Sequence, residues 1–138
     1  MMENKVITAE KQTKKNITNN IPTNKDLHYK LRLFIKGEAE GDAFGPGIAD
    51  LMRGVQKYGS LLKAAESMHM AYSKAWKIIH KVECNLGFQL IFRQVGRGCG
   101  STITPDGQRF LDAYDRFIRE VSAATQASFE KNFADFLE

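Results

Sequence analysis

Three short helical patterns follow one another in the middle of the chain, and the short breaks between them constrain the fold most. Apolar spacing predicts helices over residues 47–58, 61–68 and 72–85. Gly59-Ser60 ends the first helix and caps the second, because a serine oxygen accepts a hydrogen bond from the free amides ahead of it. A break at His69-Met70 separates the second helix from the third. This order, a short helix, a tight turn and a second helix, is that of a helix-turn-helix.

The third helical pattern is basic on its outer sides and is followed by a hairpin pattern. Its apolar positions, at i, i+4 and i+7, are Ala75, Ile79 and Val82. Residues 88–93 and 101–104 predict two strands, joined by a glycine-rich tip that carries Arg97. A helix-turn-helix with such a hairpin is a winged helix-turn-helix. In that fold one helix enters the major groove of DNA, and the wing lies along the adjacent backbone or minor groove.

The flanks of this region predict one more strand and one long helix. Residues 27–36 alternate between apolar and polar side chains, which predicts a half-buried strand, and a short strand is expected at 42–44. Thr104 is the expected N-cap of a final helix that begins at Pro105 and runs close to the C-terminus. We therefore expect a mainly α fold with a small β component. It is a winged helix-turn-helix with a leading N-terminal strand and a long C-terminal dimerisation helix.

The chain divides into three predicted parts: residues 1–25, 26–104 and 105–138. The first is polar and poor in large apolar groups, so it is expected to be a disordered arm. The second is the DNA-binding domain and the third the dimerisation helix. No apolar run approaches the roughly 18 residues that span a bilayer, and the N-terminus lacks the apolar centre of a signal peptide. We expect a cytoplasmic protein without a membrane partner.

Positive charge is concentrated in the middle of the chain, although the net charge is only +4. From Arg53 to Arg109 nine Lys and Arg stand against three Asp and Glu, a difference of +6. From Phe110 to the end, three basic residues stand against six acidic ones. This distribution indicates a local anionic partner, of which nucleic acid is the commonest. The alternative is an ordinary solvated basic surface.

Several short motifs at fixed spacing link the chain to a known family. They are Gly59-Ser60, Ala64-Ala65, Met68-His69-Met70, Leu86-Gly87, residues 90–93, Gly96-Arg97 and Thr104-Pro105-Asp106-Gly107. With them, residues 58–108 resemble the N-terminal domain of LysR-type regulators. A second set of motifs is Tyr72, Lys74-Ala75-Trp76, the 27–36 strand and Phe44-Gly45-Pro46-Gly47. With these, residues 27–125 look most similar to the DNA-binding domain of molybdate-responsive ModE-type regulators.

The resemblance implies a sequence-specific regulator of transcription that binds double-stranded DNA as a homodimer. ModE-type proteins place oxyanion-binding domains after the long helix, whereas this sequence ends at Glu138, so a molybdate-sensing domain and a small-molecule effector are not expected. The wing of that family is usually richer in Gly and Lys than residues 96–101, so its DNA contacts are expected to differ.

The candidate DNA-binding residues are Ser60, Tyr72, Ser73, Lys74, Lys77, Lys81, Arg93 and Arg97. Those at the start of the third helix are placed for base contacts, with capping and packing as the alternative. The lysines are expected to contact phosphates or bases, and the alternative is that they form an ordinary helix face exposed to solvent. Trp76 either stacks on the DNA backbone or packs against the wing. Arg97 suits the minor groove, whereas Arg93 alternatively covers the core.

The candidate dimerisation residues form a stripe with spacings of four and three along the final helix. They are Phe110, Tyr114, Phe117 and Val121. A stripe this apolar packs on the domain, on the copy of it in a partner chain, or on both. The two-fold axis of such a dimer predicts a roughly palindromic DNA site.

Two other functions were weighed against DNA-binding regulation. One is a metal- or redox-responsive regulator, because His80 and Cys84 lie at i, i+4 and Cys99 lies in the wing. The other is a winged-helix module that binds proteins, which steep salt dependence of DNA binding would exclude. The sequence offers no phosphate-binding loop and no catalytic set of carboxylates or Ser/His/Asp, so we expect no enzyme, no cofactor and no metal site.

Overall fold

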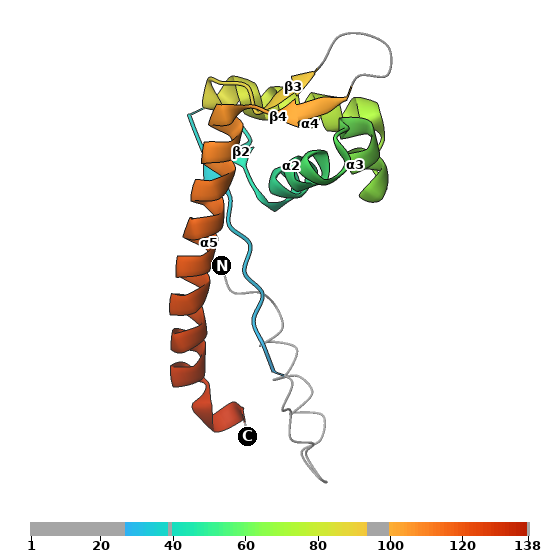
Figure 1. Cartoon of the computed structure of the whole chain (residues 1–138). Helices are drawn as coiled ribbons and strands as arrows, with labels where there is room; N and C mark the ends of the chain where they lie inside the picture. The colour runs from blue at the N-terminus through green and yellow to red at the C-terminus, as the bar shows by residue number, and fades with distance from the viewer. Residues whose placement is uncertain (1–26, 39, 94–99, 138) are drawn as a thin grey trace. The chain divides into compact units, whose positions relative to one another are not determined.

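The computed structural model describes residues 27–38, 40–93 and 100–137 (Figure 1). Its elements are β1 (Ile35–Lys36), β2 (Asp42–Phe44), α2 (Pro46–Tyr58), α3 (Leu61–Ser67), α4 (Tyr72–Leu86), β3 (Ile91–Arg93), β4 (Ser101–Ile103), α5 (Pro105–Asn132) and the 3-10 helix η1 (Ala134–Phe136). The structure is mostly helical with two small sheets, and the order of its elements confirms the predicted winged helix-turn-helix with a long C-terminal helix. The chain forms two units, one of them Leu33–Arg116 and the other made of its two ends.

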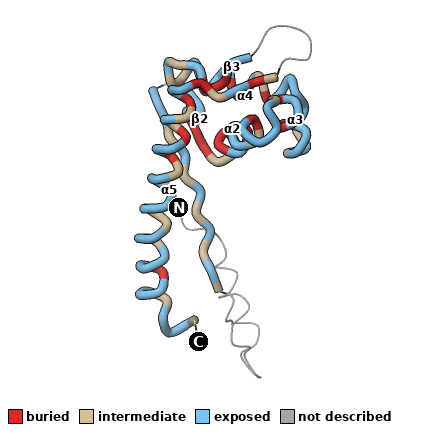
Figure 2. The backbone as a smooth tube through the Cα atoms, in the orientation of Figure 1, coloured by how far each residue is buried: buried red, intermediate tan, exposed pale blue. Residues whose placement is uncertain are grey.

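The core of the Leu33–Arg116 unit is built from one apolar face of each short helix. The buried side chains in α2, α3 and α4 are Ile48, Ala49, Leu51, Met52, Val55, Leu61, Ala64, Ala65, Ala75, Ile79 and Val82. In each helix the buried positions recur at helical spacing, and the apolar positions predicted for α4 are confirmed. Figure 2 shows buried stretches of the tube in α2, α3 and α4.

The helix ends follow from local sequence. Pro46 opens α2, where its missing N–H costs no hydrogen bond, and Gly59 ends it with a φ of 67°, a left-handed conformation that glycine adopts without strain. Ser60 Oγ accepts a hydrogen bond from Lys63 N at 3.2 Å and caps α3. Thr104 Oγ1 accepts one from Gly107 N at 2.8 Å and caps α5. The caps predicted from sequence are thus confirmed.

The wing is shorter than predicted. Strands over 88–93 and 101–104 were expected, but pairing is restricted to β3 and β4, with Ile91 opposite Ile103 and Arg93 opposite Ser101. The amides of Leu90 and Ile91 instead donate to the Glu83 carboxylate of α4, at 2.8 and 3.3 Å. A helix side chain therefore fixes the root of the wing.

The leading strand is also shorter than the expected 27–36. Only Ile35–Lys36 pairs, since its partner β2 is three residues long. The alternation of half-buried and exposed residues persists from 27 to 36, as expected from the sequence. In the unit formed by the chain ends, Tyr29 packs its ring 5.1 Å from that of Phe129. The period-2 pattern thus belongs to a segment that pairs as a strand only at its end and whose Tyr29 side chain packs on α5.

Two of the four proposed dimerisation residues pack within this chain, Tyr114 in the core and Phe110 half-buried. Tyr114 is 5% exposed, and its hydroxyl donates to the carbonyl of Leu33 at 2.8 Å. Phe110 packs edge-on against Phe44, with ring centroids 4.8 Å apart, and against Phe88 at 5.9 Å. Both side chains thus make contacts within the chain, one of the alternatives expected for this stripe, and their part in a dimer stays a prediction. No helix in the described ranges is long and apolar enough to span a membrane.

A close approach of α2 to α3 holds the helices together. A Cβ built on Gly54 would lie 2.6 Å from Cβ of Ala64 and 3.1 Å from its Cα, so glycine at 54 lets the helices touch. We predict that Gly54→Ala lowers the free energy of unfolding by about 1–3 kcal/mol in urea denaturation, because the backbones must separate.

The matched control is Gly47→Ala in the same helix. A Cβ on Gly47 has nothing within 4 Å, so alanine there should stabilise by up to ~1 kcal/mol through helix propensity. Equal effects of the two variants would contradict the close-packing argument.

Candidate nucleic-acid interface

The turn between α3 and α4 sets the direction of the exposed helix. His69 N donates to Glu66 O at 3.0 Å and Met70 N to Ala65 O at 2.9 Å, a two-bond Schellman ending of α3. The residue at the left-handed position is His69, with a φ of 56°. Glycine or asparagine is usual there, and histidine is tolerated better than most side chains. The turn is therefore closed by backbone bonds and does not depend on a glycine.

The N-terminus of α4 is exposed and uncapped. Its N-cap residue is Ala71, whose side chain accepts no hydrogen bond, and the first turn carries no acidic residue. The first amides of a helix have no partner within it, so those of Tyr72, Ser73 and Lys74 point outward from a positive helix end. This end has the backbone donors and the sign of charge that a phosphate group requires.

The three candidate lysines of α4 differ in their surroundings. Lys74, Lys77 and Lys81 are all exposed, and within the described ranges none of them forms an ion pair. Lys81 lies beside Gly41, where a built Cβ would be 3.0 Å from Lys81 Nζ. It is also nine residues beyond Tyr72, about 13 Å along the helix. Lys74 and Lys77 therefore belong to the exposed N-terminal part of α4, whereas Lys81 lies near the β1–β2 hairpin.

Tyr72, Trp76 and Arg93 form one cluster that joins α4 to the wing. Trp76 Nε1 donates to the Tyr72 hydroxyl at 2.7 Å, one helical turn away. The Arg93 guanidinium carbon lies 4.5 Å from the centre of the Trp76 ring, within the range of a cation–π contact. Trp76 is half-buried, so packing against the wing, one of its two predicted positions, is the one observed.

The remaining candidates lie at the edges of this surface. Ser60 Oγ uses one acceptor position as the α3 cap and keeps its O–H. The Ser101 amide, at the foot of the wing, donates to Gly59 O at 2.9 Å, so the wing starts next to that cap. Arg97 and Cys99 lie outside the described residues.

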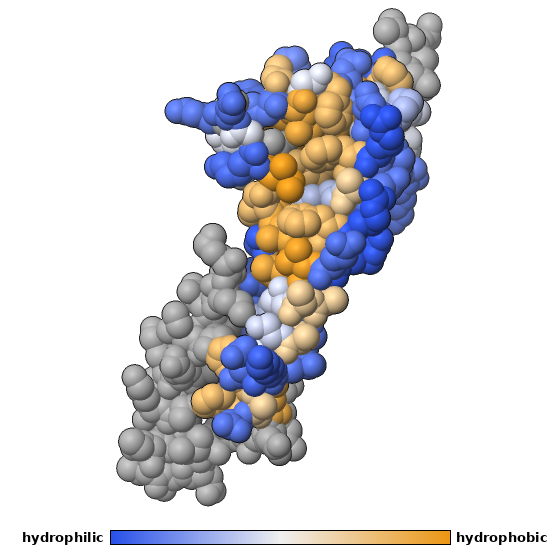
Figure 3. All heavy atoms as spheres, turned by 90° about the vertical axis from the view of Figure 1, so that its left-hand side faces the viewer, coloured by the Kyte–Doolittle hydropathy of each residue, from blue (hydrophilic) through white to orange (hydrophobic). Residues whose placement is uncertain are grey.

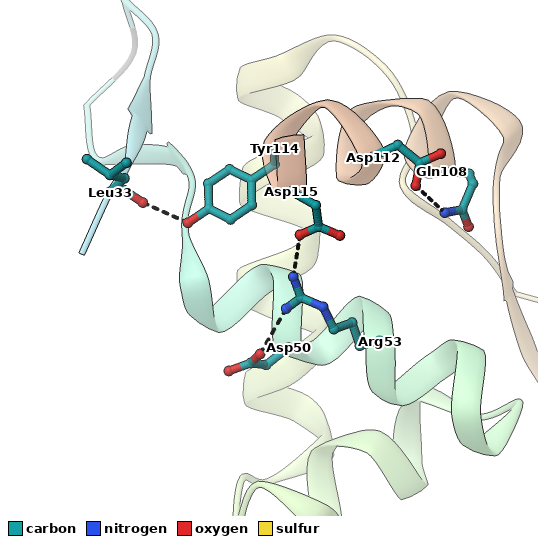
Figure 4. Close-up of polar contacts among 7 residues, drawn as sticks. All are labelled: Leu33, Asp50, Arg53, Gln108, Asp112, Tyr114 and Asp115. Atoms are coloured by element: carbon teal, nitrogen blue, oxygen red, sulfur yellow. Dashed lines mark hydrogen bonds and ion pairs between the residues drawn. The ribbon is translucent and has the colours of Figure 1, made fainter. Parts of the chain in front are cut away.

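Not all of the basic charge counted in the sequence faces this surface. Arg53 is bonded to Asp50 and to Asp115 (Figure 4), and Arg109 pairs with Asp106 at 2.7 Å. Asp50 and Asp106 each lie three residues before their arginine partner in the same helix, a spacing that the sequence can reveal. Asp115 is 62 residues away from Arg53, so that pair depends on the fold. The α4 lysines, by contrast, have no ion-pair partner among the described residues.

Two of the three residues proposed as metal ligands lie close together in the structure. His80 Nε2 and Cys84 Sγ lie 3.8 Å apart on the exposed side of α4. The described part of the chain contains no group of three potential His, Cys, Asp or Glu ligands, and the third proposed ligand falls outside it.

Comparisons with known proteins agree with this geometry. Residues 51–108 match the model of the bacterial regulatory helix-turn-helix protein, lysR family. The HTH-type transcriptional regulator YofA of Bacillus velezensis is 32% identical over 84 residues, which is 61% of this chain and 28% of that protein. The crystal structure of a CbnR_DBD-DNA complex matches with a TM-score of 0.51 and 20% identity, covering 62% of this chain and 95% of that one.

Residues 51–108 are therefore similar to the lysR-family helix-turn-helix model, and the chain shares the fold of the CbnR_DBD structure. It spans 28% of the length of the curated relative that it matches.

The left-handed turn of the helix-turn-helix makes a prediction about His69. We expect His69→Val to lower the free energy of unfolding by about 1–2 kcal/mol, because a β-branched side chain is strained at positive φ. His69→Gly should leave stability unchanged or raise it. Thermal or urea denaturation measures both.

His80→Val is the matched control, since His80 is an exposed histidine within α4. It should cost only a few tenths of a kcal/mol. If both His→Val variants lost the same stability, the strain at position 69 would not be the cause.

Proposed function

We propose that this chain, on the basis of its LysR-type helix-turn-helix domain, is a sequence-specific regulator of transcription that binds double-stranded DNA. The observation that carries the proposal is the exposed start of α4, which has free amides, no acidic neighbour in its first turn and two unpaired lysines. Such a regulator acts in the cytoplasm, where bacterial DNA lies.

In this proposal α4 enters the major groove by its N-terminal half. Tyr72 and Ser73 face base edges there, because they are the first side chains of the helix. Lys74 and Lys77 neutralise phosphates on either side of the groove, and Lys81 contributes less because of its position beside Gly41.

The wing and the cap of α3 supply further backbone contacts. Arg93 presents its charge beside α4 while it stacks on Trp76, and Arg97 is assigned to the minor groove next to the wing. Ser60 can donate its O–H to a phosphate while its oxygen caps α3. These contacts fix the position of the domain on DNA, and the start of α4 reads the sequence.

We further propose a homodimer that forms through the outer face of α5. Phe117 is 42% exposed and Val121 is half-buried. In Figure 3 apolar side chains gather on the face of the molecule that carries α5. Ala113 and Ala124 lie on the same side of the helix as Phe117, four residues before it and seven after it, so another helix could approach closely. A two-fold dimer would place two α4 helices in successive major grooves of a palindromic site.

Kinship with ModE-type regulators is a further part of the proposal. It is supported by Tyr72 together with Lys74-Ala75-Trp76 at the start of α4 and by the extended segment ahead of α2. We assign no molybdate site and no effector to residues 27–137.

The experiment that tests the main proposal is selection of bound duplexes from a random pool, followed by affinity measurements across salt concentration. We expect an enriched two-fold motif and an affinity that falls steeply with salt, because each neutralised phosphate releases counterions. Lys77→Ala should lower the slope of log affinity against log salt by about one, with little change in stability.

Lys57→Ala, which removes an exposed lysine near the end of α2, is the control and should leave the slope unchanged. Binding that requires no particular motif would favour an architectural role. Absence of binding at low salt would reject the proposal and favour a protein partner.

The dimer makes a separate prediction. Phe117→Asp should shift the molar mass in light scattering from dimer to monomer at micromolar concentration, because a charge would be buried in the interface. DNA affinity should fall with it. Leu62→Asp, at an equally exposed apolar residue of α3, should leave the mass unchanged. A monomeric unmodified chain would refute the proposed interface.

A further inference from the structure

The hydrogen bond between Trp76 and Tyr72 determines what the Tyr72 hydroxyl can offer to a ligand. A phenol has one hydrogen to donate and can also accept, whereas an indole N–H only donates. At 2.7 Å, Trp76 Nε1 must therefore be the donor and the Tyr72 oxygen the acceptor. One acceptor position of Tyr72 is used, and its hydrogen is directed away from Trp76.

That hydrogen has no partner among the described residues, and Tyr72 is 38% exposed. A hydroxyl that accepts a hydrogen bond becomes a better donor, because the two bonds polarise each other. Tyr72 thus stands at the first position of α4 as an outward-facing donor, beside the free amides of the helix end.

Arg93 fixes the orientation of Trp76 from the other side. Its guanidinium lies over the indole face at 4.5 Å, and its backbone is held in the wing by pairing with Ser101. Trp76 is half-buried, and the wing arginine covers one face of its ring. The direction of its N–H, and so of the Tyr72 hydroxyl, therefore depends on the wing.

We propose that Tyr72 donates a hydrogen bond to an acceptor on DNA, and that Trp76 and Arg93 are positioning residues that act through it. This rests on the proposed DNA-binding function. The acceptor is a purine N7, guanine O6 or thymine O4 in the major groove, or a phosphate oxygen next to it. An amino group of adenine or cytosine is a poorer partner, because Trp76 already occupies an acceptor position of the hydroxyl.

The test is a double-mutant cycle on DNA affinity with the site selected by the unmodified protein. Tyr72→Phe removes only the hydroxyl, and we expect affinity to fall about threefold to tenfold, the usual effect of one hydrogen bond. Trp76→Phe should weaken binding less, and the double variant no more than Tyr72→Phe alone, because both changes act on one contact. Tyr58→Phe, at a similarly exposed tyrosine of α2, is the control and should bind normally.

Binding of Tyr72→Phe to DNA sites with single base-pair substitutions shows whether the acceptor is a base or a phosphate. If Tyr72 contacts a base, Tyr72→Phe loses preference at one base pair only. If it contacts a phosphate, affinity falls equally on every sequence.

Trp76 is the only tryptophan of the chain, so its fluorescence reports on the cluster without DNA. Arg93→Lys keeps the charge but loses the flat stacking group. It should change the Trp76 emission and reduce affinity as Trp76→Phe does, while the salt slope stays the same.

Three results would overturn the inference. Full affinity and unchanged base preference of Tyr72→Phe would remove Tyr72 as a donor. Additive losses in Tyr72→Phe and Trp76→Phe would show that Trp76 does not act through Tyr72. Failure of the unmodified chain to bind any duplex would reject the proposed function and this inference with it, whereas the first two results would leave the proposed function intact.

Discussion

The contact of α2 with α3 is the constraint on which the rest of the Leu33–Arg116 unit depends. Seven residues are too few for a helix to be stable alone in water, so α3 exists because its buried face packs on α2. That packing is close only because position 54 carries no side chain against Ala64. The turn at His69 follows α3 directly, so the packing of α3 on α2 also sets the direction of α4.

Some basic side chains of the molecule are held in ion pairs with acidic residues, and others are exposed without such a partner among the described residues. Arg53 is held by Asp50 of its own helix and Asp115 of α5, and such exposed pairs add little stability while they neutralise the charge. The α4 lysines have no such partner among the described residues. A net charge of +4 is thus less informative than the place of Lys74 and Lys77, which lie at a helix end that already carries positive potential.

Features set by neighbours in the chain were predicted well, and features set by distant residues were not. The caps Ser60 and Thr104 each bond an amide three residues ahead, so sequence spacing is enough to find them. The hydrogen bonds from the wing root to the Glu83 carboxylate, by contrast, depend on how α4 packs against the wing, and no local sequence pattern predicts them. The apolar stripe of α5 was correctly found, but spacing alone could not separate Phe110 and Tyr114, which pack inward, from Phe117.

The sequence by itself determined the order of helices, their apolar faces, their caps and the basic character of α4, because these depend on helical periodicity and on bonds between near neighbours. Only the tertiary structure decided which arginines are neutralised, where Tyr114 is buried, and that Trp76 lies between Tyr72 and Arg93. Those arrangements join residues from separate elements. Their distances follow from the packing of whole helices and of the wing, which no local spacing encodes.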